Sequence, residues 1–477
     1  MQEGTLQIVE DLATYPQRSA VEEEMLAKGV RNLVVAPLYY QDNLIGILNL
    51  LSPNPGDLYA LNAMKLRDVL PLFSMAINRS MEELNTRIQA IIKEQCTAIH
   101  PAVEWRFRQA AIHWAEQRQC GQMAEMESIV FDDVYPLYGV SDIRGSSRLR
   151  NAMIQADLME HLGLAKEILQ LGYGLKPLPI LDELSYHVSK LMTHLETGLG
   201  SSDEMAIIDF LRREVEPLFE HMRSFAPEAE EKILAYESVI EPQLGTIYRR
   251  RKDFEDSVTH INETLSAYLD AEQEKAQAMF PHYFEKHKTD GVEYGIYIGA
   301  AMMEDGSFDM LYLYNLRLWQ LITMCGIARQ SEQVKSQLKV PLEMAHLVLI
   351  QNTPLSVRFR LDEKRFDIDG AYNMRYEIIK KRIDKALIKG TSERLTQPGK
   401  IAIIYSQPKE AMEYREYIDY LQASGYLTDD VEEVELEDLD GAQGLKSLRV
   451  TVNMSATPPD PLPSLETMIE VVEVIHK

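Results

Sequence analysis

A glycine flanked by serines and arginines is the stretch of this chain with the clearest potential for chemistry. In SDIRGSSRLRN, residues 141–151, Arg144 precedes the glycine, and Ser146 and Ser147 follow it just ahead of a segment with helical periodicity. The first backbone N–H groups of a helix are free donors, and the helix dipole adds positive charge there. The pattern can therefore bind an anion such as a phosphate group, and Arg144 and Arg148 would add full charges.

The same residues also have a purely structural interpretation. Ser146 or Ser147 can cap the helix, and Arg144 can pair with Asp142 or Asp133. The loop pattern GxxxxGK[ST], which cradles nucleotide phosphates, is absent from the sequence. Both an anion site and an ordinary capped helix therefore remain open.

A second concentration of positive charge follows in VRFRLDEKRF and RYEIIKKRIDKALIK. Arg358 and Arg360 alternate on one face of an expected strand, whereas Arg382 and Lys385 belong to an expected helix that also carries Lys389. Such a patch can bind a phosphate-bearing ligand or an acidic partner protein. The alternative is a solvated face that pairs with the acidic run VEEVELEDLD.

Metal and catalytic patterns are weaker. Asp367 and Asp369 in DIDG resemble the start of a metal loop but lack the remaining ligands of an EF-hand, so a turn ahead of the next helix is favoured. The histidines form no HExxH or comparable cluster. We therefore expect no metal site, identify no cofactor, and favour binding over catalysis.

Composition narrows the classes of partner. The net charge of −25 argues against nucleic acid or an anionic membrane as the main partner, because both are polyanions. The three cysteines lie far apart and form no disulfide or zinc framework, which fits a reducing compartment. No apolar run approaches a membrane span. These features predict a soluble cytoplasmic protein.

The sequence of the N-terminal region predicts a small sheet followed by a long helix. LQIVEDL predicts a strand, Ser19 is placed to cap a short helix, and Gly29 is placed to end it. LVVAPLYY and LIGILNL, separated by QDN, predict an antiparallel hairpin. A helix is expected from Leu58 to about Cys96.

This order of elements resembles the C-terminal half of a GAF domain over about the first 80 residues. The matching residues are Asp11, Pro16, Ser19, Gly29, Val30, Asn32, Leu33, Pro37, Leu38, Ile45, Gly46, Leu48 and Leu50. The resemblance implies a small-molecule sensor fold whose pocket lies on one face of an antiparallel sheet, and it implies that the chain begins inside the domain. Members of that family bind cyclic nucleotides, bilins, haem or metabolites, or only dimerise. A bilin is disfavoured because residues 1–80 contain no cysteine.

Two heptad patterns suggest association between helices. The first consists of Ile77, Met81, Leu84, Ile88 and Ile91, and the second of Ile240, Leu244, Ile247, Phe254, Val258, Ile261, Leu265 and Tyr268. Such seams need a partner, and a parallel homodimer is the simplest one. The alternative is that each helix packs on its own chain.

We predict a multidomain α+β protein with a partial GAF-like sheet at 1–80, connector helices at 81–125, a helical middle domain at 126–290, a mixed α+β domain at 291–455 and a tail at 456–477. VYPLYGVSDIRGSS, FEKHKTDGVEYGIYIG and FDIDGAYNMRYEIIKKRIDKA resemble bacterial GAF-containing regulatory proteins. That resemblance implies a signalling role without a defined reaction. A nucleotide- or phosphate-handling enzyme and a ligand-free dimeric scaffold are the alternatives.

Overall fold

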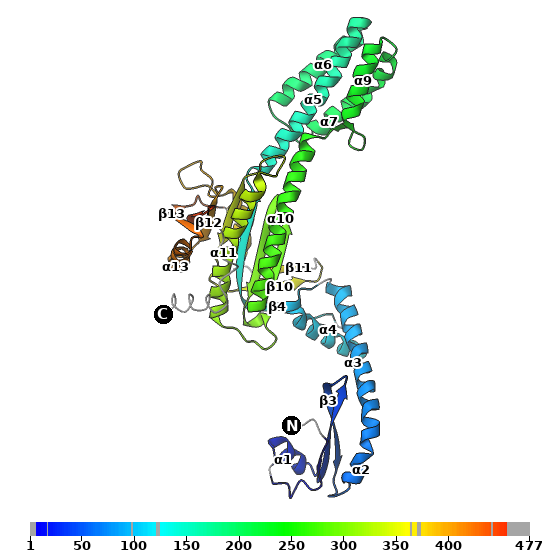
Figure 1. Cartoon of the computed structure of the whole chain (residues 1–477), viewed down its shortest axis with the longest axis vertical. Coiled ribbons are helices and arrows are strands. Elements are labelled where there is room, and N and C mark those ends of the chain that lie inside the picture. Colours follow the sequence, from blue (N-terminus) through cyan, green and yellow to red (C-terminus); the bar gives the residue numbers. More distant parts are fainter. Residues whose placement is uncertain are drawn as a thin grey trace. The chain divides into compact units, whose positions relative to one another are not determined.

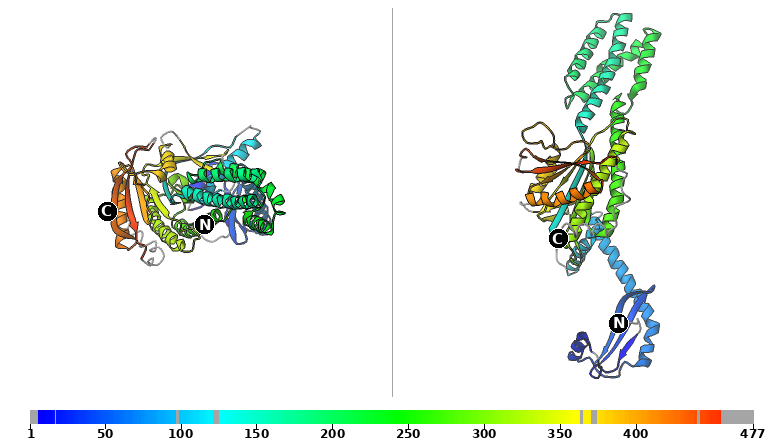
Figure 2. Two further views of the ribbon diagram at one scale, coloured as in Figure 1. Left: turned by 90° about the horizontal axis from the view of Figure 1, so that it is seen from above. Right: turned by 60° about the vertical axis from the view of Figure 1, so that its left-hand side comes forward.

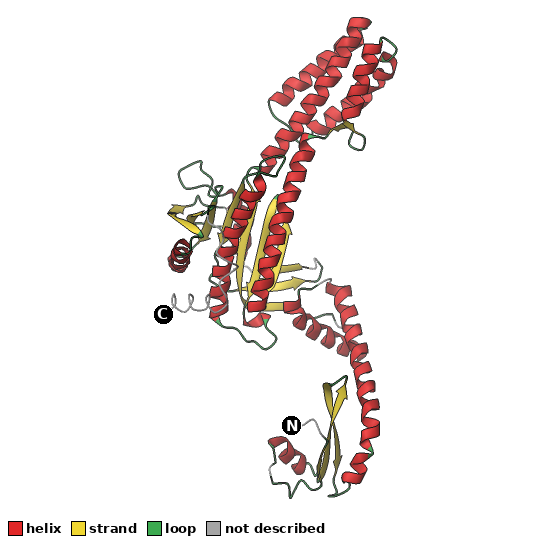
Figure 3. Cartoon of the chain, in the orientation of Figure 1, coloured by secondary structure: helices red, strands yellow, loops and turns green. Residues whose placement is uncertain are grey.

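The computed structural model describes residues 6–16, 18–96, 99–120, 125–362, 365–369, 374–439 and 442–455. The expected tail at 456–477 lies outside these residues. The predicted multidomain α+β class is confirmed, since the chain combines two substantial sheets with many helices (Figure 3). Within the described part of the chain, no helix has both the length and the apolar character needed to cross a membrane.

Contacts divide the chain into two compact units. The N-terminal unit comprises Met1–Ile99, Glu104–Ile129 and Leu361–Lys364. The C-terminal unit comprises His100–Val103, Val130–Arg360 and Arg365–Lys477.

The N-terminal unit is built on a three-stranded antiparallel sheet of β1 (Gln7–Val9), β2 (Asn32–Tyr40) and β3 (Asn43–Ser52), with α1 (Ala20–Ala27) between β1 and β2. The predicted cap is confirmed, because Ser19 and Glu22 form a reciprocal capping box. Gly29 has the positive φ expected after a helix end. The predicted hairpin is confirmed, with Gln41 and Asp42 both at positive φ, as a tight hairpin turn requires.

Three helices follow the sheet in this unit. The expected helix at 58–96 is observed as α2 (Ala60–Met64) and α3 (Leu66–Cys96), and α3 contacts β2 and then α4 (Glu104–Gln119). Near its end, Ile88 and Ile91 are buried, whereas Met81 and Leu84 are 47% and 50% exposed. The first heptad seam is thus partly covered by its own chain.

In the C-terminal unit, nine of the described strands form one sheet. They are β4 (Ile129–Ile143), β7 (Tyr283–Lys288), β8 (Gly291–Ile298), β9 (Met344–Leu349), β10 (Leu355–Arg360), β11 (Arg365–Asp369), β12 (Lys400–Tyr405), β13 (Leu427–Glu435) and β14 (Lys446–Val452). The order is β11-β10-β4-β9-β12-β14-β13, with β8 also pairing with β4 and β7 pairing with β8. β9 and β12 are parallel neighbours.

Helices cover both faces of this sheet. On one face lie α10 (Arg250–Met279), α11 (Met310–Lys335) and α13 (Pro408–Ala423), whose side chains share one core with alternate residues of β8, β12 and β14. α10 and α11 run side by side there (Figure 1). On the other face, α12 (Met374–Arg382) packs on Tyr138, Val140 and Ile404.

A helical module is inserted between β4 and β7. It contains α5 (Ser146–Leu175), α6 (Pro179–Glu196), α7 (Asp203–Phe210), α8 (Glu216–Met222) and α9 (Pro227–Val239). The module has its own apolar core and lies beyond the end of the sheet, to which α5 and α10 connect it (Figures 1 and 2).

Two expectations about the middle of the chain are wrong. Residues 129–143 were expected in a helical domain but form β4, a strand inside the large sheet, so this sheet begins well before residue 291. The continuous heptad helix at 240–268 is also not observed. Ile240–Ile247 form a short β5–β6 hairpin with Gly245 at positive φ, and α10 begins only at Arg250. Left-handed glycine backbone interrupts a helix, which explains the break.

Candidate anion-binding turn between β4 and α5

The turn from β4 into α5 carries the residues that the sequence suggested as a candidate anion site. Gly145 occupies the N-cap position with φ 69° and ψ 26°, a left-handed conformation that favours glycine. Glycine offers no side-chain acceptor, and the first helical hydrogen bond is from the Leu149 N–H to the Gly145 carbonyl. The N–H groups of Ser146, Ser147 and Arg148 precede that bond, so the helix itself provides no acceptor for them.

The structural alternative for the serines is therefore incorrect. Ser146 and Ser147 lie within the first turn of α5, so neither is the N-cap residue. Ser146 is largely buried and Ser147 is exposed. Two short side chains with hydroxyl groups thus stand beside three backbone donors, at the positive end of a 30-residue helix.

Neighbouring backbone holds this turn in place. The Ile143 N–H donates to the Asp290 carbonyl at 2.9 Å, and the Arg144 N–H donates to the Glu343 carbonyl at 2.8 Å. The Arg150 guanidinium donates to the Asp290 carboxylate at 2.6 Å. These bonds join β4, the β7–β8 turn and the start of β9, so the turn is supported from two sides.

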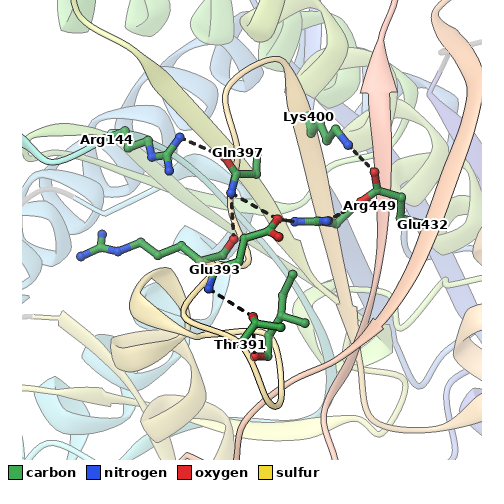
Figure 4. Close-up of polar contacts among 9 residues, drawn as sticks. Arg144, Thr391, Glu393, Gln397, Lys400, Glu432 and Arg449 are labelled. Atoms are coloured by element: carbon green, nitrogen blue, oxygen red, sulfur yellow. Dashed lines mark hydrogen bonds and ion pairs between the residues drawn. The ribbon is translucent and has the colours of Figure 1, made fainter.

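Arg144 is linked to a polar network on the α12 side of the sheet (Figure 4). Its guanidinium donates to the side-chain oxygen of Gln397 at 2.9 Å, and the Gln397 amide donates to Glu393 at 3.4 Å. Arg144 therefore bonds to a neutral amide, where the sequence alternative placed the carboxylate of Asp142 or Asp133. Because glutamine is neutral, this hydrogen bond does not compensate the positive charge of Arg144.

The far end of the network is a compact set of ion pairs. Arg449 is buried and donates to Glu393 at 2.6 Å and to Glu432 at 2.8 Å, and Lys400 also bonds to Glu432. The hydrogen bond from Lys400 lowers the pKa of Glu432, and the bond from Arg449 lowers the pKa of Glu393. The network therefore fixes the loop that carries Gln397 against β13 and β14.

The second predicted patch is divided in the structure. Arg358 on β10 pairs with Asp369 on β11 at 2.8 Å, and Arg360 pairs with Asp367 at 3.2 Å. The two aspartates of DIDG are thus strand residues that neutralise the arginines, so the turn that the sequence favoured for them is incorrect. Across the described residues, no group of three or more histidine, cysteine or acidic side chains is placed to hold a metal ion.

The remaining basic residues do not share one helix. α12 ends at Arg382, and Lys385 lies in the following short 3₁₀ turn, Ile383–Lys385. Both side chains are exposed. Lys389 follows the turn and pairs with Glu435 of the acidic run at 3.6 Å, as the solvated-face alternative expected for that residue.

Sequence reasoning missed several residues around the β4–α5 turn. Gln397 lies 253 positions from Arg144, and Asp290 lies 140 positions from Arg150. No local pattern links such residues, because their proximity follows from the pairing of β4 with β8 and β9. The sequence patterns also did not single out Arg449, which lies on β14.

Comparisons with known proteins add little. No protein-family model and no curated protein matches the chain. Among solved structures, the crystal structure of the guanylyl cyclase Cya2 is similar over 69% of this chain and 98% of that chain, with 11% sequence identity and a TM-score of 0.27. A similarity at that level carries no argument about this protein.

Proposed function

We propose that this protein is a cytoplasmic regulatory protein that binds a phosphate-bearing ligand at the β4–α5 turn and relays that binding along α5. The N-terminal unit serves as a GAF-like sensor in this proposal, and the C-terminal unit as the output or partner-binding part. No catalytic step is needed for such a role. The continuity of α5 is the observation that carries the proposal.

α5 joins the candidate site to two separate cores. It begins at the turn, and Leu149 and Met153 in its first turns pack against the core of the large sheet. Farther along, Leu158 and Leu162 are buried in the core of the helical module. Because α5 is one helix of 30 residues, we expect a displacement of its first turn to be transmitted to the helical module.

A buried carboxylate couples α5 to α10. Asp157 is 2% exposed and accepts hydrogen bonds from the backbone N–H groups of Arg250 at 3.1 Å and Arg251 at 3.0 Å. Asp157 thereby caps the N-terminus of α10 from a neighbouring helix. The Arg250 guanidinium also pairs with Asp157 and Glu160 on α5. The two connecting helices are thus expected to move together.

The sensor part of the proposal draws on the N-terminal unit alone. The strand, helix, hairpin and long helix occur there in the order that the GAF resemblance implies. α3 is 31 residues long and begins beside β2, which suits a helix that carries a signal away from a sheet.

Phosphate binding at the turn can be tested on the full chain with inorganic phosphate, ATP, GTP and cyclic nucleotides. A ligand bound only by the folded state raises the melting temperature. We expect at least one compound to do so, with the effect reduced by added salt. The double variant Arg144→Gln and Arg148→Gln should abolish the shift, whereas Arg213→Gln, an exposed arginine of the helical module, should leave it unchanged.

Hydrogen exchange measured with the same ligand tests the relay. Protection should change in α5 beyond Asp157 and in the first turns of α10, because those segments share the buried cap. If hydrogen exchange changes only at residues 144–150, the turn binds the ligand but the binding is not relayed along α5. If none of the compounds alters melting, the ligand-free scaffold becomes the better description.

One observation favours the enzyme alternative. Asp142 lies opposite Gly291 in the β4–β8 ladder, so it is one position removed from Asp290 at the same end of the sheet. Two carboxylates beside a phosphate site can hold a divalent cation that assists phosphoryl chemistry. In this structure Arg150 pairs with Asp290. Turnover of a nucleotide with Mg²⁺ or Mn²⁺ that is lost in Asp142→Asn would favour the enzyme.

A further inference from the structure

A pocket of about 130 Å³ lies in the C-terminal unit, away from the β4–α5 turn. Its polar lining comes from Gln351, Thr353, Ser406, Gln407 and Glu410, together with Tyr376 of α12. The volume is several times the roughly 10–15 Å³ that one water molecule needs. The pocket therefore has room for a small organic molecule.

The pocket occupies a place in the sheet where ligands commonly bind. It opens at the carboxyl ends of β9 and β12, which are parallel neighbours. After β9 the chain first forms β10 and β11 and then reaches α12 on one face of the sheet, whereas after β12 it continues directly to α13 on the opposite face. Residues that follow both strands line the pocket, and the space outside the carboxyl ends of parallel strands is the usual ligand position in open α/β sheets.

The most informative group in the lining is the carboxylate of Glu410. It is 2% exposed, and it accepts hydrogen bonds from the backbone N–H groups of Ser406 and Gln407, both at 2.9 Å, and from that of Asn352 at 3.2 Å. All of these donors are neutral. Its negative charge is supported by the N-terminus of α13 and by no ion pair recorded among the described residues.

A second buried acceptor lies beside it. Asn352 stands between the lining residues Gln351 and Thr353, and its side-chain oxygen is buried without a hydrogen-bond partner in the structure. Asn352 is not itself one of the residues that line the pocket, so the feature of the lining that favours a ligand with N–H donors is the buried carboxylate of Glu410.

We infer that this pocket binds a small organic ammonium compound. The ammonium group would lie at the Glu410 carboxylate, because hydrogen bonds between an ionised donor and a carboxylate are shorter and stronger than those between neutral groups. The carbon part would lie against Leu355, Ile379 and Leu445, which form the apolar side of the lining. An anion is disfavoured, since the N-terminus of α13 already holds the glutamate side chain. The inference is independent of phosphate binding at the β4–α5 turn.

The test compares n-butylammonium with n-butanol, a neutral molecule of similar size, by calorimetry on the full chain at constant ionic strength. Butylammonium should bind at least tenfold more tightly than butanol. Glu410→Gln should weaken butylammonium binding at least tenfold, and glutamine at this position can still take part in the capping box. Glu416→Gln removes the same charge from an exposed position of α13 outside the lining and should bind like the parent.

Equal affinity for the ammonium and the alcohol would overturn the inference, as would unchanged butylammonium binding in Glu410→Gln. If Glu410→Gln fails to fold, the comparison of the two compounds on the parent chain still decides the outcome. The absence of any butylammonium binding to the parent also rejects the proposal.

Discussion

At the scale of single residues, His161 illustrates how the chain uses a titratable group for structure. Its ring lies 3.1 Å from the Thr246 hydroxyl and 2.6 Å from the Tyr236 hydroxyl, and Tyr236 donates to Glu216 at 2.9 Å. Burial lowers the pKa of His161 to about 4. The neutral ring satisfies this arrangement, with one nitrogen donating and the other accepting, so the group joins α5 to α9 and the β5–β6 hairpin.

Acidification should therefore destabilise the C-terminal unit. Burial lowers the pKa values of His161, His282 and His346 to about 4 each, whereas an unfolded histidine titrates near its ordinary pKa of about 6.5. Their contribution is complete above about pH 6.5 and falls as the pH drops toward 4, because the unfolded state binds the protons first. At pH 5 each histidine should cost about 2 kcal/mol of unfolding free energy.

Urea unfolding at pH 7.5 and pH 5 checks this expectation. His161→Gln should reduce the loss of stability between the two pH values, whereas His194→Gln, at an exposed position, should not. A parent protein whose midpoint is the same at both pH values contradicts the assignment of these histidines as buried and neutral.

Single residues also mark what sequence reasoning could and could not find. Ser19 and Gly29 were identifiable because capping and helix ends depend on near neighbours in the chain, whereas at the start of α5 the sequence offered Ser146 or Ser147 as the cap and the structure places Gly145 there. The partner of Arg144 was not identifiable, because Gln397 reaches it only through the folded sheet. Charge patterns were likewise ambiguous, since Arg358 is neutralised across a hairpin by Asp369.

At the scale of elements, β4 shows that proline and glycine in a sequence do not always mark a turn. Pro136 and Gly139 in VYPLYG are residue types that commonly mark turns, yet both lie within the β4–β8 ladder. The reason at Gly139 is packing: a Cβ atom there would lie 2.7 Å from the ring of Tyr294. The glycine thus accommodates an aromatic ring above the strand, and the strand continues through it.

Two glycine substitutions should have opposite effects on stability. Gly163 lies within α5, and a Cβ atom there would meet nothing within 4 Å, so Gly163→Ala should stabilise the helix by about 0.5–1 kcal/mol. At Gly291 a Cβ atom would lie 2.2 Å from the Ser141 carbonyl oxygen. The Ser141 oxygen belongs to the backbone and cannot move away without separating β4 from β8. Gly291→Ala should therefore lower the free energy of unfolding by about 1–3 kcal/mol.

Chemical denaturation of each variant, monitored by circular dichroism, measures both values. The comparison has an internal control, because the same replacement is made in both cases and only the surroundings differ. A stabilising Gly291→Ala would mean that β4 and β8 are less closely packed at this turn than the structure indicates.

At the scale of the whole molecule, the residues of the two heptad patterns differ in how far their own chain buries them. Phe254, Ile261 and Leu265 of the second pattern are fully buried in the core that α10 shares with α11 and the sheet. Those residues therefore have partners within their own chain. Met81 and Leu84 of the first pattern remain about half exposed. Periodicity correctly identified apolar faces in both helices, but it could not specify what covers them.

The predicted parallel homodimer thus depends on α3, and two aspartate substitutions separate association from folding. Leu84→Asp places a charge on an exposed part of the seam, so it should convert a dimer into a folded monomer. Leu265→Asp buries a charge inside the C-terminal core, so it should cost more than about 3 kcal/mol and unfold that unit whatever the oligomeric state. Sedimentation and circular dichroism distinguish these outcomes. A parent chain that sediments as a monomer at high concentration contradicts the dimer.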